Sequence, residues 1–106
     1  NVETHFDPEP EISLESKEAL YRITQEALHN IAKHANATRV GLTLQEMDGQ
    51  LVLEIRDNGK GFDTSREFSG HLGMRSMPER AAQIGSEFQI QSLPGEGTVI
   101  TVRLSK

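Results

Sequence analysis

The segment Ser16–Ala37 has a helical pattern with one apolar side, and the rest of the chain must provide a surface that packs against this side. Wound at 3.6 residues per turn, the segment aligns small and branched side chains at every fourth residue. The members of this apolar stripe are Ala19, Ile23, Ala27 and Ile31. A second, polar stripe consists of Arg22, Glu26, Asn30 and Lys33. Alone, a polar stripe is typical of a solvated face, so its meaning depends on what the chain places against it.

Alternating patterns elsewhere predict the sheet that covers this helix. The predicted strands are, in chain order, 2–6, 40–44, 51–55, 88–90 and 98–104. Asp48-Gly49 is typical of a hairpin turn, and Ser13 or Ser16 is expected to cap the long helix. A second helix is expected to start at a capping box, with Pro78 in its first turn, over 76–85. We therefore predict an α+β two-layer sandwich, with helices on one face of a mixed, mainly antiparallel sheet.

Two polar residues continue the apolar faces of predicted strands. Asp57 is the next residue in phase with Leu51, Leu53 and Ile55, and Thr98 is in phase with the apolar residues of the last strand. An acid on a buried face is costly unless it has a partner. A carboxylate at a strand end, followed by glycines, can accept a hydrogen bond from the exocyclic amine of a ligand. A type I′ turn at Asp57-Asn58-Gly59 explains the same residues without a ligand.

A glycine-rich segment separates the third strand from the second helix. It contains Asn58-Gly59-Lys60-Gly61 and, later, Gly70-His71-Leu72-Gly73. A long loop in a small domain is uncommon unless it is functional, and glycines before a helix expose N–H groups that suit phosphate oxygens. The spacing matches neither the P-loop nor the dinucleotide-binding fingerprint. A flexible surface loop accounts for the second glycine cluster equally well.

Length and composition exclude several classes of protein. The 106 residues are enough for one domain, 1–106, and the formal net charge of −5 argues against a nucleic-acid interface. Without cysteine, neither a disulfide framework nor a thiolate metal site is possible. No apolar run approaches the roughly 20 residues that span a bilayer. Since the sequence begins with Asn, we expect a fragment of a longer protein, whose other parts could include a membrane segment.

The long helix also carries residue types that can bind zinc or iron. Glu26 and His29 resemble half of a carboxylate-bridged dimetal site, but the sequence has no second Glu-x-x-His. His29 and His34 are separated by about 140° around a helix, so they cannot share a metal ion. His34 suits a phosphate or solvent contact better.

Four motifs together resemble one family. They are QEALHNIAKHA (Gln25–Ala35), DNGKGF (Asp57–Phe62), GHLGM (Gly70–Met74) and GEGT (Gly95–Thr98). In this order they resemble the N box, the two glycine boxes and the final Gly-x-Gly-Thr of the ATP-binding domain shared by DNA gyrase B, chaperone ATPases, histidine kinases and mismatch-repair ATPases, the GHKL family with the Bergerat fold. The stretches 19–37 and 73–85 and the short spacer 62–70 look most like sensor histidine kinases of the nitrate-sensor type.

The resemblance implies a role for each matching residue on the helix side of an ATP pocket. Asn30 would be a ligand of the Mg²⁺ that bridges the phosphates. Glu26 would orient or deprotonate the attacking group. Lys33 and His34 would contact phosphates or the ribose.

On the sheet side, Asp57 would accept a hydrogen bond from the adenine amino group, directly and through a water shared with Thr98. Gly59 and Gly61 would admit the base. The second glycine box would close over the phosphates, through Gly70, His71, Leu72, Gly73 and Met74. Pro78 departs from the family, because relatives usually have a helix-compatible polar or charged residue there.

The implied activity is that of the catalytic domain of a two-component sensor histidine kinase with ATP and Mg²⁺ as cofactors. Its partners would be a histidine on a separate dimerisation domain and a response regulator, with no nucleic acid. The phosphoacceptor helix is absent from this sequence, and none of its four histidines lies in that motif. We expect the chain to be monomeric, its parent homodimeric, and the domain cytoplasmic even if the parent is membrane-anchored. An anti-sigma-type serine-protein kinase and a non-catalytic module of the same fold are the alternatives.

Overall fold

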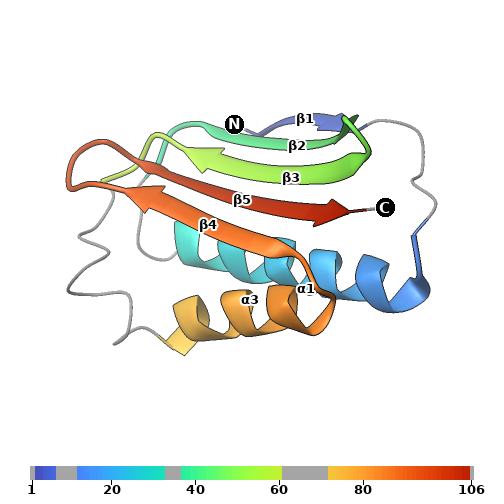
Figure 1. Cartoon of the computed structure of the whole chain (residues 1–106). Coiled ribbons are helices and arrows are strands. Elements are labelled where there is room, and N and C mark those ends of the chain that lie inside the picture. Colours follow the sequence, from blue (N-terminus) through green and yellow to red (C-terminus); the bar gives the residue numbers. More distant parts are fainter. Residues whose placement is uncertain (1, 7–11, 33–36, 61–71, 106) are drawn as a thin grey trace.

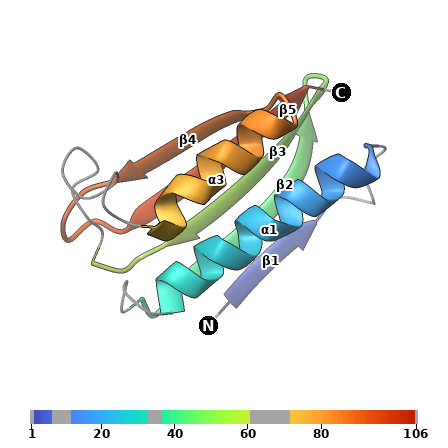
Figure 2. The same ribbon diagram turned by 90° about the horizontal axis from the view of Figure 1, so that it is seen from below.

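The computed structural model describes residues 2–6, 12–32, 37–60 and 72–105, and for residues 2, 5, 6 and 72–75 it describes the backbone alone. The elements in chain order are β1 (Val2–Phe6), α1 (Leu14–Asn30), β2 (Val40–Met47), β3 (Gln50–Asp57), α3 (Leu72–Gln83), β4 (Glu87–Ser92) and β5 (Thr98–Ser105). Both helices lie on one face of the sheet (Figure 1) and run side by side across it (Figure 2). The predicted two-layer α+β sandwich is confirmed.

The five strands form one mixed sheet in the order β1-β2-β3-β5-β4. β1 is parallel to β2 and occupies an edge, as its short pattern predicted, while the other three pairings are antiparallel. Asp48 and Gly49 join β2 to β3, and both have positive φ, of 51° and 77°. Positive φ at both central residues is what a type I′ hairpin turn requires, so this predicted turn is confirmed.

The inner face of the sheet consists of rows of residues paired across the strands. One row contains Leu44, Leu53, Val102 and Phe88, and the next contains Leu42, Ile55, Ile100 and Ile90. The helices cover these rows with the buried side chains of Leu20, Ile23, Ala27, Met77 and Ala81. A third row follows in the same phase, with Val40, Asp57, Thr98 and Ser92. The apolar core therefore ends in a row that is mostly polar.

Helix α1 is shorter at its end than the sequence predicted. Ser13 caps its start, since the Ser13 hydroxyl accepts from the Ser16 N–H at 3.1 Å. The α-helix ends at Asn30, and a π-helical turn follows at residues 31–32, where the N–H of Ile31 is shared between two carbonyls of the preceding turn. The predicted last residue, Ala37, is not helical, so the predicted end at that residue is wrong. Residues 33–36 lie outside the described part of the chain. After them, the side chain of Asn58 accepts hydrogen bonds from the N–H groups of Thr38 and Arg39 and holds this segment in an irregular conformation.

Helix α3 begins earlier than the sequence predicted. Its first residue is Leu72 and Pro78 lies inside it, so the predicted start at Ser76, with the proline in the first turn, is wrong. A proline inside a helix removes one backbone hydrogen bond. Burial of Met77 and Ala81, one turn apart against the core, holds the helix across this position. Tertiary packing therefore outweighs the local signal. Among the described residues, no helix is long and apolar enough to cross a membrane.

Candidate functional site

The polar row at the end of the inner face brings together the two residues that the sequence singled out on the sheet. Asp57 ends β3 and is the direct cross-strand partner of Thr98, the first residue of β5. Both are buried, with exposed fractions of 6% and 8%. Directly opposed side chains in an antiparallel pair lie within contact range of each other. Asp57 is therefore a residue of an internal strand, paired on both sides, and the alternative of a hairpin turn at this position does not apply.

The carboxyl group of Asp57 is held by its own loop. Its Oδ1 accepts a hydrogen bond from the Gly59 N–H at 2.7 Å. Burial raises the pKa of Asp57 above its ordinary value of 3.8, and the Gly59 hydrogen bond lowers it in part. Burial opposes the charged form of an acid because a low-dielectric surrounding solvates the charge poorly.

Thr98 has a second hydroxyl as a neighbour. Ser92, the last residue of β4, is 8% exposed, and its Oγ lies 2.8 Å from Thr98 Oγ1. The Ser92 hydroxyl also donates to the carbonyl oxygen of Gly97 at 3.0 Å. The polar row thus carries a short hydrogen-bonded chain from Gly97 through Ser92 to Thr98, beside the Asp57 carboxyl group.

Three loops are joined at this end of the sheet. Asn58 accepts from the N–H groups of Thr38 and Arg39 at 3.0 and 2.9 Å, which ties the β3 end to the segment before β2. The Gly95 N–H donates to the carbonyl of Lys60, which ties it to the β4–β5 turn. These contacts fix the backbone that carries Asp57 and Thr98.

Gly97, in the β4–β5 turn, lies very close to the backbone of Asp57. A side-chain Cβ at Gly97 would collide with the carbonyl oxygen of Asp57, and its φ is +78°. A residue with a side chain can satisfy neither condition without strain. The glycine therefore allows the β4–β5 turn to pack directly on the backbone of Asp57.

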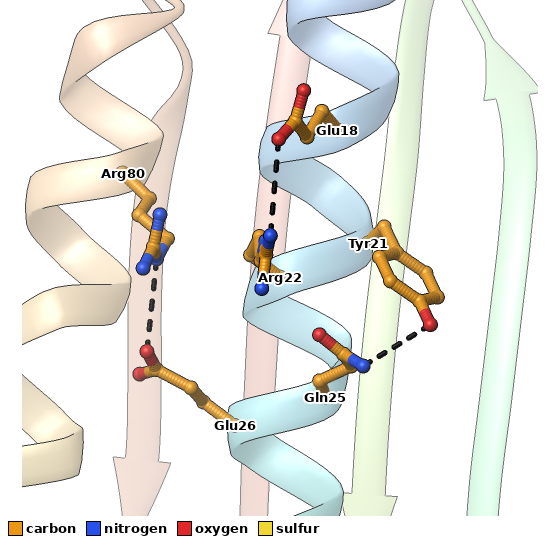
Figure 3. A network of polar contacts seen from close by, with 6 residues as sticks. All are labelled: Glu18, Tyr21, Arg22, Gln25, Glu26 and Arg80. Carbon is orange, nitrogen blue, oxygen red and sulfur yellow. Dashed lines mark hydrogen bonds and ion pairs between the residues drawn. The ribbon is translucent and has the colours of Figure 1, made fainter.

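The polar stripe of α1 separates into two parts. Arg22 forms an exposed i,i+4 pair with Glu18 at 4.0 Å, which is a solvated contact. Glu26, one turn later, points toward α3 and forms an ion pair with Arg80, with Glu26 Oε1 3.6 Å from Arg80 Nε (Figure 3). The other carboxylate oxygen of Glu26 accepts from the hydroxyl of Ser76. Two side chains one turn apart on α3 therefore hold this carboxylate.

Asn30 ends α1 with an incompletely paired side chain. Its Nδ2 is buried and has no hydrogen-bond partner in the described part of the chain. An open pocket of about 610 Å³ lies along this end of the helix. The described residues that line it are Gln25, Glu26, Leu28, His29 and Asn30. A buried amide nitrogen without a partner is uncommon in a protein interior, so Asn30 has a hydrogen-bond donor to offer at this pocket.

Both parts of the candidate site lie at the same end of the molecule. The C-terminal end of α1, the end of β3 and the beginning of β5 are together in both views (Figures 1 and 2). The structure thus brings Glu26 and Asn30 to the side on which Asp57 and Thr98 close the core. Gly59 follows in the loop after β3 and is buried.

The remaining predicted site residues are described in part or not at all. Leu72, Gly73 and Met74 form the first turn of α3 instead of a loop before it. The others lie outside the described residues: Lys33, His34, Gly61, Gly70 and His71. Their predicted roles stay predictions.

Sequence reasoning missed four residues that the structure adds to the site. Ser92 is in phase with Phe88 and Ile90, so the signal that found Thr98 could have found it too. Gly97 lay in a quoted motif but had no assigned role. Ser76 and Arg80 gave no signal, because nothing in a sequence shows which helix a polar side chain will face.

Comparison with known proteins agrees with this arrangement. The sequence model of the family described as "Histidine kinase-, DNA gyrase B-, and HSP90-like ATPase" matches residues 15–106. The chain is 46% identical over 84 residues to the sensor protein VraS of Staphylococcus epidermidis, a match that covers 79% of this chain and 24% of VraS. The chain thus spans about a quarter of the length of the curated relatives it matches.

Two solved structures have the same fold. The histidine kinase domain of the blue-light activated histidine kinase EL346 from Erythrobacter litoralis superposes with a TM-score of 0.82 at 20% identity, over 98% of this chain and 51% of that one. Full-length ShkA, solved in complex with AMPPNP, gives a TM-score of 0.76 at 21% identity, over 97% and 25%.

We expect Gly97→Ala to destabilise the fold more than Gly95→Ala. Both glycines have positive φ, so an added side chain is strained at either position, but only Gly97 lies against the Asp57 backbone, while Gly95 faces open space. The expected excess in lost unfolding free energy is about 1–3 kcal/mol, measured by urea denaturation of both variants. Equal losses would show that the close approach at Gly97 is unimportant.

Removal of the Asp57 charge should change the pH dependence of stability. Since the folded-state pKa lies above 3.8, the folded form binds the Asp57 proton more tightly than the unfolded form. The resulting stabilisation is complete below pH 3.8 and is lost as the pH rises through the folded pKa. The stability of Asp57→Asn relative to the wild type should therefore increase with pH across that window. Denaturation at a series of pH values measures this, and a constant difference would contradict it.

Proposed function

The chain belongs to the family of histidine kinase-, DNA gyrase B- and HSP90-like ATPases, and we propose that it is the catalytic, ATP-binding domain of a sensor histidine kinase, as its similarity to VraS supports. In this proposal it binds Mg·ATP between the polar row of the sheet and the end of α1. The observation that carries this placement is the burial of Asp57 in register with Thr98, where the apolar rows of the core end. A ligand that completes this core must have an apolar surface and a hydrogen-bond donor at its edge. The adenine base has both.

On the base side, Asp57 accepts from the exocyclic amine of adenine, and Thr98 acts beside it through a shared water. Asp57 is suited to this because its Oδ1 is already fixed by the Gly59 N–H and its strand partner is Thr98. Gly59 and Gly61 would let the base approach the backbone. An ionised carboxylate only accepts hydrogen bonds, which matches an amino group.

On the phosphate side, the donor set fits Mg²⁺. The Asn30 carboxamide lies at the pocket with its nitrogen buried and unpaired. That nitrogen could donate to a phosphate oxygen, and the oxygen of the same carboxamide is a ligand that Mg²⁺ accepts. Mg²⁺ usually takes only one or two protein ligands, with waters and phosphates supplying the others. When bound, it would offset the negative charge of the phosphates as the γ-phosphoryl group leaves. Lys33, His34 and the second glycine box from Gly70 to Met74 would contact the phosphates.

Glu26 is the proposed catalytic residue. In the parent protein, a nitrogen of the acceptor histidine would attack the γ-phosphorus while ADP leaves with the bridging oxygen. Glu26 would orient the imidazole or take its proton, and Ser76 and Arg80 hold the carboxylate in one orientation for this step. A positioned acid–base group of this kind contributes typically about 10²–10⁴ in rate.

The partners follow from the same proposal. The acceptor histidine would lie on the dimerisation domain of a homodimeric parent, and the phosphoryl group would pass to an aspartate of a response regulator. The similarity to a protein named as a sensor, VraS, supports this. The motifs of α3 and the short segment before it support a kinase of the nitrate-sensor type.

Asp57→Asn should weaken Mg·ATP binding by about ten- to hundredfold, the loss expected for one hydrogen bond to a charged group. Isothermal titration of the chain with Mg·ATP measures the Kd. Asp48→Asn is the matched control, because it makes the same change in the exposed turn at the other end of β3. Wild-type affinity in Asp57→Asn would refute the placement of the base.

Glu26→Gln should lower histidine phosphorylation in the full-length parent by about 10²-fold or more while ATP binding stays near the wild-type level. Labelling with γ-³²P-ATP gives the rate. Glu18→Gln, at an exposed position two turns earlier on the same helix, should behave like the wild type. Full phosphorylation by Glu26→Gln would remove Glu26 from the catalytic machinery.

A further inference from the structure

We propose that Ser92 determines which purine the site accepts. By taking up the hydroxyl hydrogen of Thr98, it turns the Asp57–Thr98 pair into a pure hydrogen-bond acceptor that selects a 6-amino purine over a 6-oxo purine. The inference rests on the proposed function, because it concerns the base end of the same ATP site. It adds a residue to which neither the motifs nor the family resemblance assigned a role.

The contacts that join Ser92 to Gly97 and to Thr98 indicate which hydroxyl group donates in each. A hydroxyl group has one hydrogen to donate. The carbonyl oxygen of Gly97 can only accept, so the hydrogen in the 3.0 Å contact comes from Ser92. In the 2.8 Å contact with Thr98, Ser92 must then be the acceptor. The single hydroxyl hydrogen of Thr98 is therefore directed at Ser92, and only its lone pairs remain for a ligand.

This arrangement is held by the fold. Ser92 and Thr98 are direct cross-strand partners in β4 and β5, and both are 8% exposed, so water competes little for either hydroxyl. The Gly97 carbonyl is fixed as well, since the backbone on both sides of Gly97 is constrained by the close approach to Asp57. Rotation of the Thr98 hydroxyl hydrogen toward a ligand would break the 2.8 Å hydrogen bond to Ser92 in a buried place. Such a loss costs free energy.

The chemical consequence concerns position 6 of the purine. The ionised carboxylate of Asp57 and the Thr98 hydroxyl, whose hydrogen is directed at Ser92, present hydrogen-bond acceptors side by side. Adenine offers an amino group there, which donates to them directly or through a water. Hypoxanthine and guanine offer a carbonyl oxygen, which can only accept, so two acceptors would face each other. A site that pairs with a donor rejects an analogue that lacks it, because its buried polar groups are left unpaired.

Without Ser92, the hydroxyl hydrogen of Thr98 is no longer directed at a fixed acceptor. In Ser92→Ala the Thr98 hydroxyl can rotate and donate to a 6-oxo group. We therefore expect the preference for ATP over inosine triphosphate, expressed as the ratio of the two Kd values, to fall by about three- to tenfold, the range for one neutral hydrogen bond. Inosine triphosphate is the right probe, because it replaces the 6-amino group of ATP and adds no 2-amino group.

The experiment is isothermal titration of the chain with Mg·ATP and Mg·ITP. Ser86→Ala is the matched control: Ser86 precedes β4 at its other end and loses a similar bond, a 2.8 Å contact to the Ala81 carbonyl. The control should keep the wild-type ratio. Ser92→Thr retains the hydroxyl and should keep it too.

A second variant does not depend on the folding of Ser92→Ala. Thr98→Val removes an acceptor, so it should weaken ATP more than ITP and lower the ratio. An unchanged ratio in Ser92→Ala, or a Thr98→Val variant that weakens ITP as much as ATP, would overturn the assignment while ATP binding itself remains. If the wild-type chain bound neither nucleotide, the proposed function would fall, and this inference with it.

Discussion

A buried carboxyl group at the end of an apolar face is the constraint to which the rest of this structure responds. Two complete rows of the inner face are apolar, and the next places Asp57 where a branched side chain would pack better. An acid in such a place lowers stability unless the surroundings offer hydrogen bonds. The hydrogen bond from the Gly59 N–H and the close packing of the Gly97 turn on the Asp57 backbone are the adjustments seen around it. The burial of Asp57 thus serves the proposed function at a cost in folding stability.

The two sides of the site are held by different kinds of interaction. On the base side, backbone pairing fixes the relation of Asp57 to Thr98, so their spacing cannot change without breaking strand register. On the phosphate side, Glu26 depends on side-chain contacts between two helices, partly open to solvent. Register is rigid, whereas long side chains adjust at low cost. The proposed recognition of the base is therefore built in more firmly than the placement of the proposed catalytic carboxylate.

Most of the fold could be predicted because its signals are periodic. Alternation in the strands, the Asp48-Gly49 turn and the in-phase polarity of Asp57 and Thr98 are all local, and all agree with the structure. The start of α3 could not be predicted this way. Its local sequence has a good capping box at Ser76, but packing of the helix on the core decides the outcome, and Ser76 contacts Glu26 instead.

Contacts between distant elements were equally out of reach. The pairing of Glu26 with Arg80 depends on how two helices are set side by side, and no spacing within either helix contains that information. The hydrogen bonds from the N–H groups of Thr38 and Arg39 to the side chain of Asn58 likewise join two segments that are about 20 residues apart in the sequence. Roles assigned by resemblance are strongest where register or burial supports them, as for Asp57.

The position of Pro78 has a consequence for how Glu26 is held. Because proline has no N–H, the backbone ladder of α3 lacks the bond that would join residue 78 to the carbonyl of Met74. The first turn, residues 72–75, is thus less firmly joined to the turns after it, and it can open locally at a lower free energy. Ser76 and Arg80 both follow this turn, and the buried side chain of Met77 between them anchors this part of α3 to the core. Opening of the first turn would therefore leave both contacts of the Glu26 carboxylate in place.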